Sequence, residues 1–97
     1  MYIPNCKIDL SGLTVSDLDR IAIEKLMNGL VGKSPSDSYL KLCILNGENK
    51  VNGFLSITSK SRKFESSQYG ENPLNVVKKL SKDLQSQIKI WAAQREF

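Results

Sequence analysis

The sequence predicts an α+β fold with the element order β-α-β-β-β-α, in which two helices pack on one face of a four-stranded sheet. Two segments, at about 15–31 and from 73 onward, repeat apolar residues at helical spacing and carry one apolar stripe each. Three strand-like segments between them are joined by short turns, which indicates an antiparallel meander. Helices with a single apolar stripe bury it most economically against one shared sheet face. The chain is expected to form one domain over residues 1–97.

The first strand and the start of the first helix are signalled by alternation and by a capping residue. Residues 7–10 alternate polar and apolar side chains, and Ser11-Gly12 ends this strand. Thr14 or Ser16 is the expected N-cap of a helix over about 15–31. The aspartates in its first turn are favoured by the helix dipole.

The core-facing side of the first helix is predicted from its apolar spacing. The expected stripe consists of Leu18, Ile21, Ala22, Leu26 and Leu30. Gly32 is well placed to end the helix, because a glycine tolerates the left-handed conformation common just after a helix. A loop follows at 33–37, which contains a proline.

Three further strands are predicted at 39–45, 51–59 and 63–69. Asn46-Gly47-Glu48-Asn49 is a hairpin turn between the first two of these. Residues 60–62 turn the chain into the last strand, and Gly70 breaks that strand. The added strand at 7–10 completes a four-stranded sheet.

The last helix has clear start signals and a long apolar stripe. Asn72 is the expected N-cap, with Pro73 at the first helical position, where a missing N–H costs nothing. The helix is expected to run for about 20 residues. Its apolar stripe consists of Val77, Leu80, Leu84, Ile88 and Trp91, so the tryptophan is expected in the core.

The composition argues against an enzyme and against a cofactor. There is no histidine, and Cys6 and Cys43 are the only cysteines, which we expect to be reduced and buried. Two cysteines cannot build a closed zinc site. No nucleophile elbow, phosphate-cradling glycine loop or metal-ligand spacing occurs. We therefore expect no catalytic residues, no metal, no cofactor and no small-molecule substrate.

The chain is expected to be cytoplasmic and to have no membrane partner. No apolar run approaches the roughly 18–20 residues of a transmembrane helix. Residues 1–5 lack the basic flank and apolar run of a secretory signal.

The net charge of +4 is concentrated in the second half of the chain. Residues 1–49 hold five Lys or Arg against six acids, whereas residues 50–97 hold nine against four. A one-sided positive balance suggests a polyanionic partner. The candidate RNA-binding residues are the lysines opposite the apolar stripe of the last helix and a cluster at the turn before the fourth strand. They are Lys78, Lys79, Lys82, Lys89, Lys60, Arg62 and Lys63.

The helix lysines form a row that is suited to phosphates, although a plain solvated helix face remains an alternative interpretation. At 100° per residue they fall within a sector of about 100° that extends along about 16 Å of helix. The sector contains no acid, since Asp83 lies to one side. A solvated helix face more often interleaves carboxylates with its lysines.

Nearly the whole chain resembles the hibernation-promoting factor and ribosome-associated inhibitor family, also called sigma-factor modulation proteins. The resemblance is carried by residues 54–58 and 64–74, which run into the last helix. In that family a strand of small and polar residues ends at a glycine, one acidic or polar residue follows, and an aspartate then caps a long basic helix. Gly70, Glu71 and Asn72 stand in those places, with asparagine instead of aspartate. Residues 8–18 likewise look like the family's first strand and helix start.

The resemblance implies a short form of the family, without its C-terminal dimerisation domain. It implies binding to the small ribosomal subunit and its ribosomal RNA in the channel for messenger and transfer RNA. Such binding inhibits translation and protects idle ribosomes under stress, and it would be read through phosphate geometry and charge more than base sequence.

Two other functions remain open from the residues alone. The first helix carries only Arg20 and Lys25 as basic residues, fewer than family members commonly have, which favours a protein-interaction module without RNA binding. Such a partner would dock on the exposed sheet face, through Tyr39, Lys41 or Tyr69, or on a strand edge. A double-stranded RNA-binding domain is the second alternative, although that fold lacks a strand before its first helix.

Overall fold

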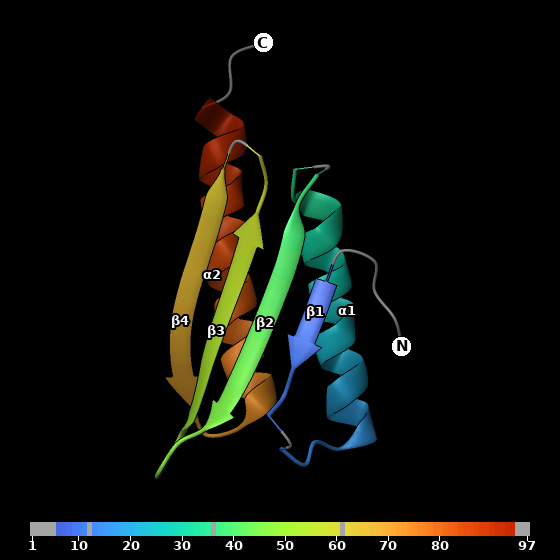
Figure 1. Ribbon diagram of the computed structural model, residues 1–97, viewed down its shortest axis with the longest axis vertical. Helices are drawn as coiled ribbons and strands as arrows, with labels where there is room; N and C mark the ends of the chain where they lie inside the picture. Colours follow the sequence, from blue (N-terminus) through green and yellow to red (C-terminus); the bar gives the residue numbers. More distant parts are fainter. Residues whose placement is uncertain (1–5, 12, 36, 61, 95–97) are drawn as a thin grey trace.

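The computed structural model describes residues 6–11, 13–35, 37–60 and 62–94 and confirms the predicted element order (Figure 1). Every strand boundary lies within one residue of the predicted one. The elements are β1 (Cys6–Asp9), α1 (Asp17–Lys33), β2 (Tyr39–Asn46), β3 (Val51–Thr58), β4 (Lys63–Gly70) and α2 (Pro73–Gln94).

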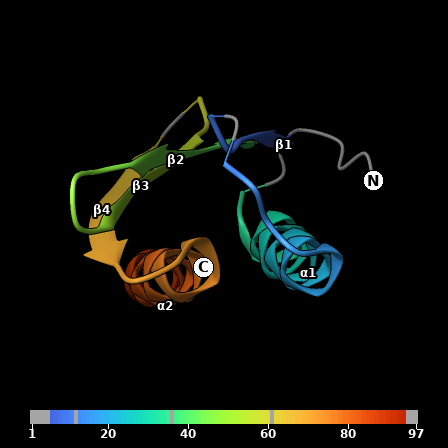
Figure 2. The ribbon, with the colours of Figure 1, turned by 90° about the horizontal axis from the view of Figure 1, so that it is seen from below.

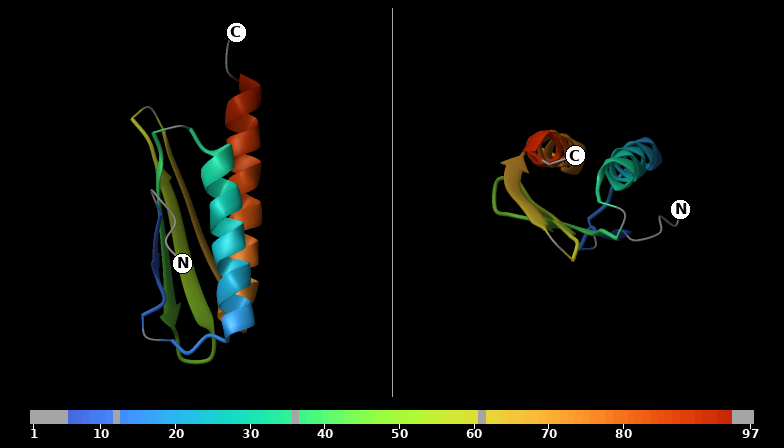
Figure 3. Two further views of the ribbon diagram at one scale, coloured as in Figure 1. Left: turned by 90° about the vertical axis from the view of Figure 1, so that its right-hand side faces the viewer. Right: turned by 90° about the horizontal axis from the view of Figure 1, so that it is seen from above.

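The sheet is mixed, with the strands in the order β1-β2-β3-β4. β1 pairs parallel with β2, and β2, β3 and β4 form the predicted antiparallel meander. Seen along the strands, both helices lie on the same side of the sheet (Figures 2 and 3). The prediction of two helices on one face is therefore confirmed. We call the other side, which the described elements leave uncovered, the open face.

The core lies between the sheet and the two helices. Its buried apolar residues come from α1, β2, β3, β4 and α2, and the fully buried large side chains are Ile23, Met27, Leu30, Leu40, Leu42, Ile44, Leu55, Ile57, Leu80, Leu84, Val76 and Val77. Trp91 packs on this core, as predicted, with its ring edge-on to Phe64 at a centroid distance of 6.1 Å. Gly53 lets α2 approach the sheet, because a Cβ at this position would collide with Val76 and Ile44.

The predicted core-facing side of α1 is partly wrong. Leu18 is 80% exposed and Ile21 is 47% exposed, whereas Ile23 and Met27 are buried. The buried side is therefore rotated by about 100° around the helix axis from the predicted stripe. At 100° per residue, α1 has two overlapping apolar stripes, and both contain Leu30. The packing of α1 beside α2 selects the second stripe.

The ends of α1 also differ from the prediction. Ser16 is the N-cap, one of the two expected residues, and its hydroxyl oxygen accepts from the N–H of Asp19 at 3.1 Å, so the helix starts at Asp17 and not at 15. Gly32 does not end the helix, because it lies within the last turn. Ser34 ends it instead: its N–H and hydroxyl both donate to the Leu30 carbonyl, at 3.0 and 2.6 Å.

The two cysteines are free but only half-buried, which corrects the expectation that both are core residues. Cys6 is the register neighbour of buried Leu40 and faces the helices, whereas Cys43 borders the open face. Among the described residues, no group of three or more His, Cys, Asp or Glu could hold a metal ion. Within the same ranges, neither helix has the length and apolar character needed to cross a bilayer.

Candidate nucleic-acid interface

The cap and the buried residues of α2 show which of its sides faces outward. The side chain of Asn72 caps the helix, as predicted, by accepting from the N–H of Asn75 at 2.8 Å. The buried residues of the helix then turn its apolar side to the sheet: Val76, Val77, Leu80, Ser81, Leu84 and Ile88. All four predicted lysines of the opposite sector are exposed, namely Lys78, Lys79, Lys82 and Lys89.

The helix lysines are not neutralised by carboxylates among the residues that the structure describes. Asp83, the one acid of α2, is turned toward β4, where it accepts a hydrogen bond from the Ser66 hydroxyl. Within the described ranges, the ion pair that forms is that of Lys63 with Glu65, away from this sector. The ammonium groups of α2 therefore keep a positive field directed at solvent.

Lys79 differs from the other three because it has partners in the protein. Its ammonium donates to the backbone carbonyl of Tyr69 at 2.8 Å and lies 5.8 Å from the centre of the Tyr69 ring. Lys79 therefore joins the start of α2 to the end of β4. A phosphate that binds at this position would share the ammonium with the carbonyl.

The structure adds a lysine that the sequence reasoning missed. Lys33 ends α1 beside α2, and its ammonium lies 3.5 Å from the side-chain oxygen of Gln85. Together with Lys82 and Lys89 it lines a shallow hollow between the two helices. The sequence placed Lys33 in the loop after the first helix, whereas the structure places it in the last turn of α1, where a cation is favoured by the helix dipole. Nothing in the spacing places it beside α2.

We call Lys33, Lys78, Lys79, Lys82 and Lys89 the basic surface. It spans the outer side of α2 and the end of α1, on the side of the molecule opposite the open face (Figure 3). Several cations on a rigid scaffold, unpaired with carboxylates, suit a polyanion whose charges repeat along a backbone. Lysine contributes here as a point charge without base selectivity.

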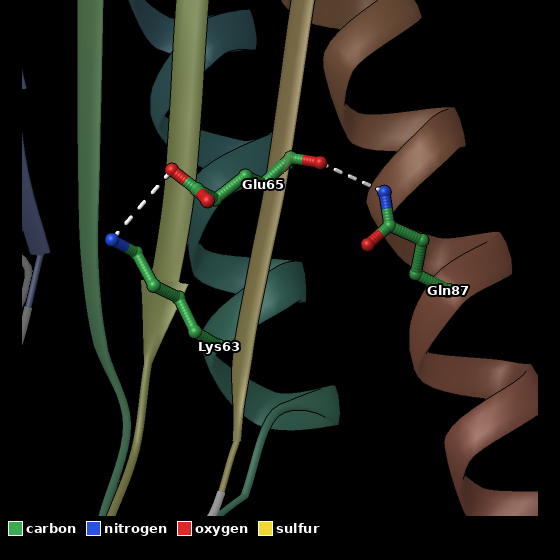
Figure 4. Close-up of polar contacts among 3 residues, drawn as sticks. All are labelled: Lys63, Glu65 and Gln87. Atoms are coloured by element: carbon green, nitrogen blue, oxygen red, sulfur yellow. Dashed lines mark hydrogen bonds and ion pairs between the residues drawn. The ribbon is translucent and has the colours of Figure 1, made fainter.

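The predicted cluster at the β3–β4 turn does not extend the basic surface. Lys63 points to the open face, where its ammonium pairs with Glu65 at 3.6 Å, while the Glu65 carbonyl accepts from Gln87 of α2 at 2.9 Å (Figure 4). Lys60 and Arg62 are exposed in the turn, and the N–H of Lys60 is bound by the Asp37 carboxylate at 2.9 Å. The structure therefore does not bring Lys63 together with the α2 lysines.

Fold and site together define a small α+β domain with a basic helical side and an uncovered sheet. Solved structures with this fold include a ribosomal subunit interface protein from Coxiella burnetii, with a TM-score of 0.73 and 14% identity over 92% of this chain and 98% of that one. They also include the N-terminal domain of Thermus thermophilus Protein Y, with a TM-score of 0.61 and 14% identity over 87% of this chain and 99% of that domain.

This shared fold agrees with the family resemblance found in the sequence. No protein-family model matches the chain. No curated protein matches it in sequence.

Proposed function

We propose that this chain associates with the ribosome and lays the basic surface on ribosomal RNA of the small subunit. Bound there, it would inhibit translation and protect idle ribosomes. The observation that carries the proposal is the row of α2 lysines without carboxylate partners among the described residues, on a fold shared with a ribosomal subunit interface protein. The interaction is electrostatic, so it depends on phosphate positions and on ionic strength more than on base sequence.

The hollow between the helices is the centre of the proposed contact. Lys33, Lys82 and Lys89 border it from two elements whose relative position is fixed by the core. Three ammonium groups held on a rigid frame lose less conformational freedom on binding than lysines on a flexible tail. We assign Lys78 and Lys79 to flanking phosphates, and Lys60, Arg62 and Lys63 to weaker contacts outside the basic surface.

The test is co-sedimentation of the tagged protein with purified small subunits in sucrose gradients at two salt concentrations. We expect the wild-type chain to sediment with the subunits at low salt and to dissociate as salt rises, with a log–log slope of roughly 0.7–0.9 for each phosphate contacted. The double substitution Lys82→Glu/Lys89→Glu should abolish co-sedimentation at low salt.

The matched control is Arg20→Glu/Lys25→Glu on α1, which changes the net charge by the same amount. Both control residues are exposed and lie outside the basic surface. We expect this variant to retain most of its binding, because only the long-range attraction is reduced. Equal binding by the two double variants and the wild type would refute the assignment. Equal loss in both would show that net charge acts without a defined surface.

The double-stranded RNA-binding alternative is disfavoured by β1, which precedes α1 and pairs with β2 over four residues. Gel shifts with plain duplex RNA, set beside the sedimentation result, separate the two functions. Binding to duplex RNA with the same affinity as to small subunits would favour the alternative.

A further inference from the structure

The open face of the sheet carries large side chains that no described element covers. Strand alternation turns every second residue of the strands away from the helices. Four large apolar or aromatic residues are exposed on this side: Tyr39, Leu45, Phe54 and Tyr69, with exposed fractions of 49%, 52%, 38% and 61%. Figure 2 shows the helices confined to the other face. These rings are not needed for the core, which is complete without them.

Phe54 and Tyr69 are neighbours on adjacent strands. Phe54 is opposite Ser67 and Tyr69 is opposite Asn52, so the two rings occupy diagonal positions of the β3–β4 ladder. Residues at such diagonal positions are within reach of one another when they are aromatic. The two rings line a hollow with Cys43, Leu45, Asn52 and Ser67. The hollow is therefore mainly apolar, with the polar side chains of Asn52 and Ser67 beside the two rings.

The open face also carries cations without partners among the described residues. Lys7 and Lys41 are register neighbours on β1 and β2, both exposed. Among the described residues, the nearby carboxylates form no ion pair with these two lysines: Asp9 accepts from the N–H of Ser11 at 2.9 Å, and Glu65 pairs with Lys63. Like charges side by side on paired strands are unfavourable, and a bound anion would relieve their repulsion.

A further cation stands directly at one ring. The ammonium of Lys50 lies 4.3 Å from the centre of the Tyr69 ring, in cation–π geometry. The ring is thus exposed, oriented and bordered by positive charge. A planar base on the ring and a phosphate on the lysine would satisfy both groups at once.

We propose that the open face binds single-stranded RNA, with bases stacked on Phe54 and Tyr69 and phosphates held by Lys7, Lys41 and Lys50. Single strands offer unstacked bases together with a charged backbone, which is the combination that this face complements. A second copy of the chain fits less well, because face-to-face docking would bring the Lys7–Lys41 pairs of both copies into one interface. This site meets the basic surface at Lys79, whose ammonium lies 5.8 Å from the centre of the Tyr69 ring, but it does not depend on ribosome association.

The test is fluorescence anisotropy with a labelled oligouridine of about ten nucleotides, a length within the range of single-strand sites. We expect Phe54→Ala and Tyr69→Ala to weaken binding about tenfold each, which is the lower part of the range for loss of one stacked base. Phe54→Tyr and Tyr69→Phe should keep near wild-type affinity, because each retains a ring. Circular dichroism checks that the variants are folded.

The matched controls distinguish base stacking from binding through apolar contacts and from binding to the lysines of α2. Leu45→Ala removes an exposed apolar side chain of the same hollow but no ring, and it should change affinity less than twofold. Lys82→Glu/Lys89→Glu should retain oligouridine binding, so a failure of this proposal and a failure of the ribosome assignment are seen in different variants.

Four outcomes would overturn the proposal. The first is wild-type protein that does not bind the oligonucleotide at low salt, and the second is unchanged affinity in Phe54→Ala/Tyr69→Ala. The third is self-association in analytical ultracentrifugation that both Leu45→Ala and Phe54→Ala abolish, which would make the open face an interface between copies. The fourth is a protein ligand whose binding is insensitive to salt and is lost in Leu45→Ala as fully as in the ring variants. Such a protein would replace RNA as the occupant.

Discussion

At the scale of single residues, the alternation along a strand decides whether a side chain faces the core or the open face. Cys6 and Cys43 lie on paired strands, but Cys6 packs against the core and Cys43 faces the open side. Burial raises the pKa of the Cys6 thiol, since the thiolate loses hydration there. The folded state therefore holds this thiol protonated to higher pH than the unfolded chain does.

We expect the Cys6 thiol to ionise above the ordinary thiol range, and this can be measured directly. In a Cys43→Ser variant, thiolate absorbance should rise at higher pH in the folded protein than in the same variant in urea. A raised pKa also means that folding loses stability as pH increases past the ordinary thiol value, because the unfolded chain then binds fewer protons. Coincident folded and unfolded titrations would contradict this assignment.

Also at the residue scale, Lys79 shows that a sequence pattern can predict that a side chain is exposed but not which groups it will contact. The spacing of the α2 lysines predicted their common sector, and the structure confirms that all are exposed. The hydrogen bond of Lys79 to the Tyr69 carbonyl could not be predicted, because it depends on how β4 meets α2. The same holds for Lys33, whose neighbour Gln85 is 52 residues away in the chain.

At the scale of elements, α1 and α2 differ in how strongly the sequence specifies their buried side. The stripe of α2 is long and unambiguous, and the structure buries it as predicted. In α1, apolar residues surround more of the helix, so Leu18 and Ile21 competed with Ile23 and Met27 for the core. Tertiary packing decided between them, and periodicity alone could not.

Two glycine-to-alanine substitutions are expected to change the stability of the protein in opposite directions, because one glycine lies in a packed contact and the other does not. Gly53→Ala should destabilise the protein by about 1–3 kcal/mol, since the added methyl group would collide with Val76 and Ile44 where α2 meets β3. Gly29→Ala should stabilise it by about 0.5–1 kcal/mol, because Gly29 lies inside α1 with open space around its Cα. Urea unfolding monitored by circular dichroism measures both. A destabilising Gly29→Ala would show that α1 does not keep this helical geometry in solution.

At the scale of the whole molecule, both helices and three of the strands contribute to one core. Leu30 of α1 and Leu84 of α2 are fully buried in the same cluster. We therefore expect unfolding to be a single cooperative transition. Trp91 fluorescence and far-UV circular dichroism should give coincident urea curves. Leu30→Ala and Leu84→Ala should each shift the whole transition by about 2–5 kcal/mol. Separate transitions would instead indicate two independently folding parts.

The whole-molecule arrangement also explains what the sequence could predict about the site. Element order and sidedness followed from periodicity, so the fold and the outward lysines were predictable. The separation of Lys63 from the α2 lysines was not, because it depends on which face β4 presents at its first residue. Of the two exposed rings of β3 and β4, Tyr69 was expected on the exposed sheet face, whereas the exposure of Phe54 became apparent only once the helices were placed.

The last consequence concerns the border of the sheet at β4. Gln87 and Lys79 of α2 donate hydrogen bonds to the carbonyls of Glu65 and Tyr69, so two acceptors of this outer strand are already occupied. An additional strand would have to displace both hydrogen bonds before it could pair with β4. The opposite border is the four-residue β1, too short to template a long ladder. Strand addition at the β4 edge is therefore opposed by hydrogen bonds from α2, while the described elements leave the open face uncovered.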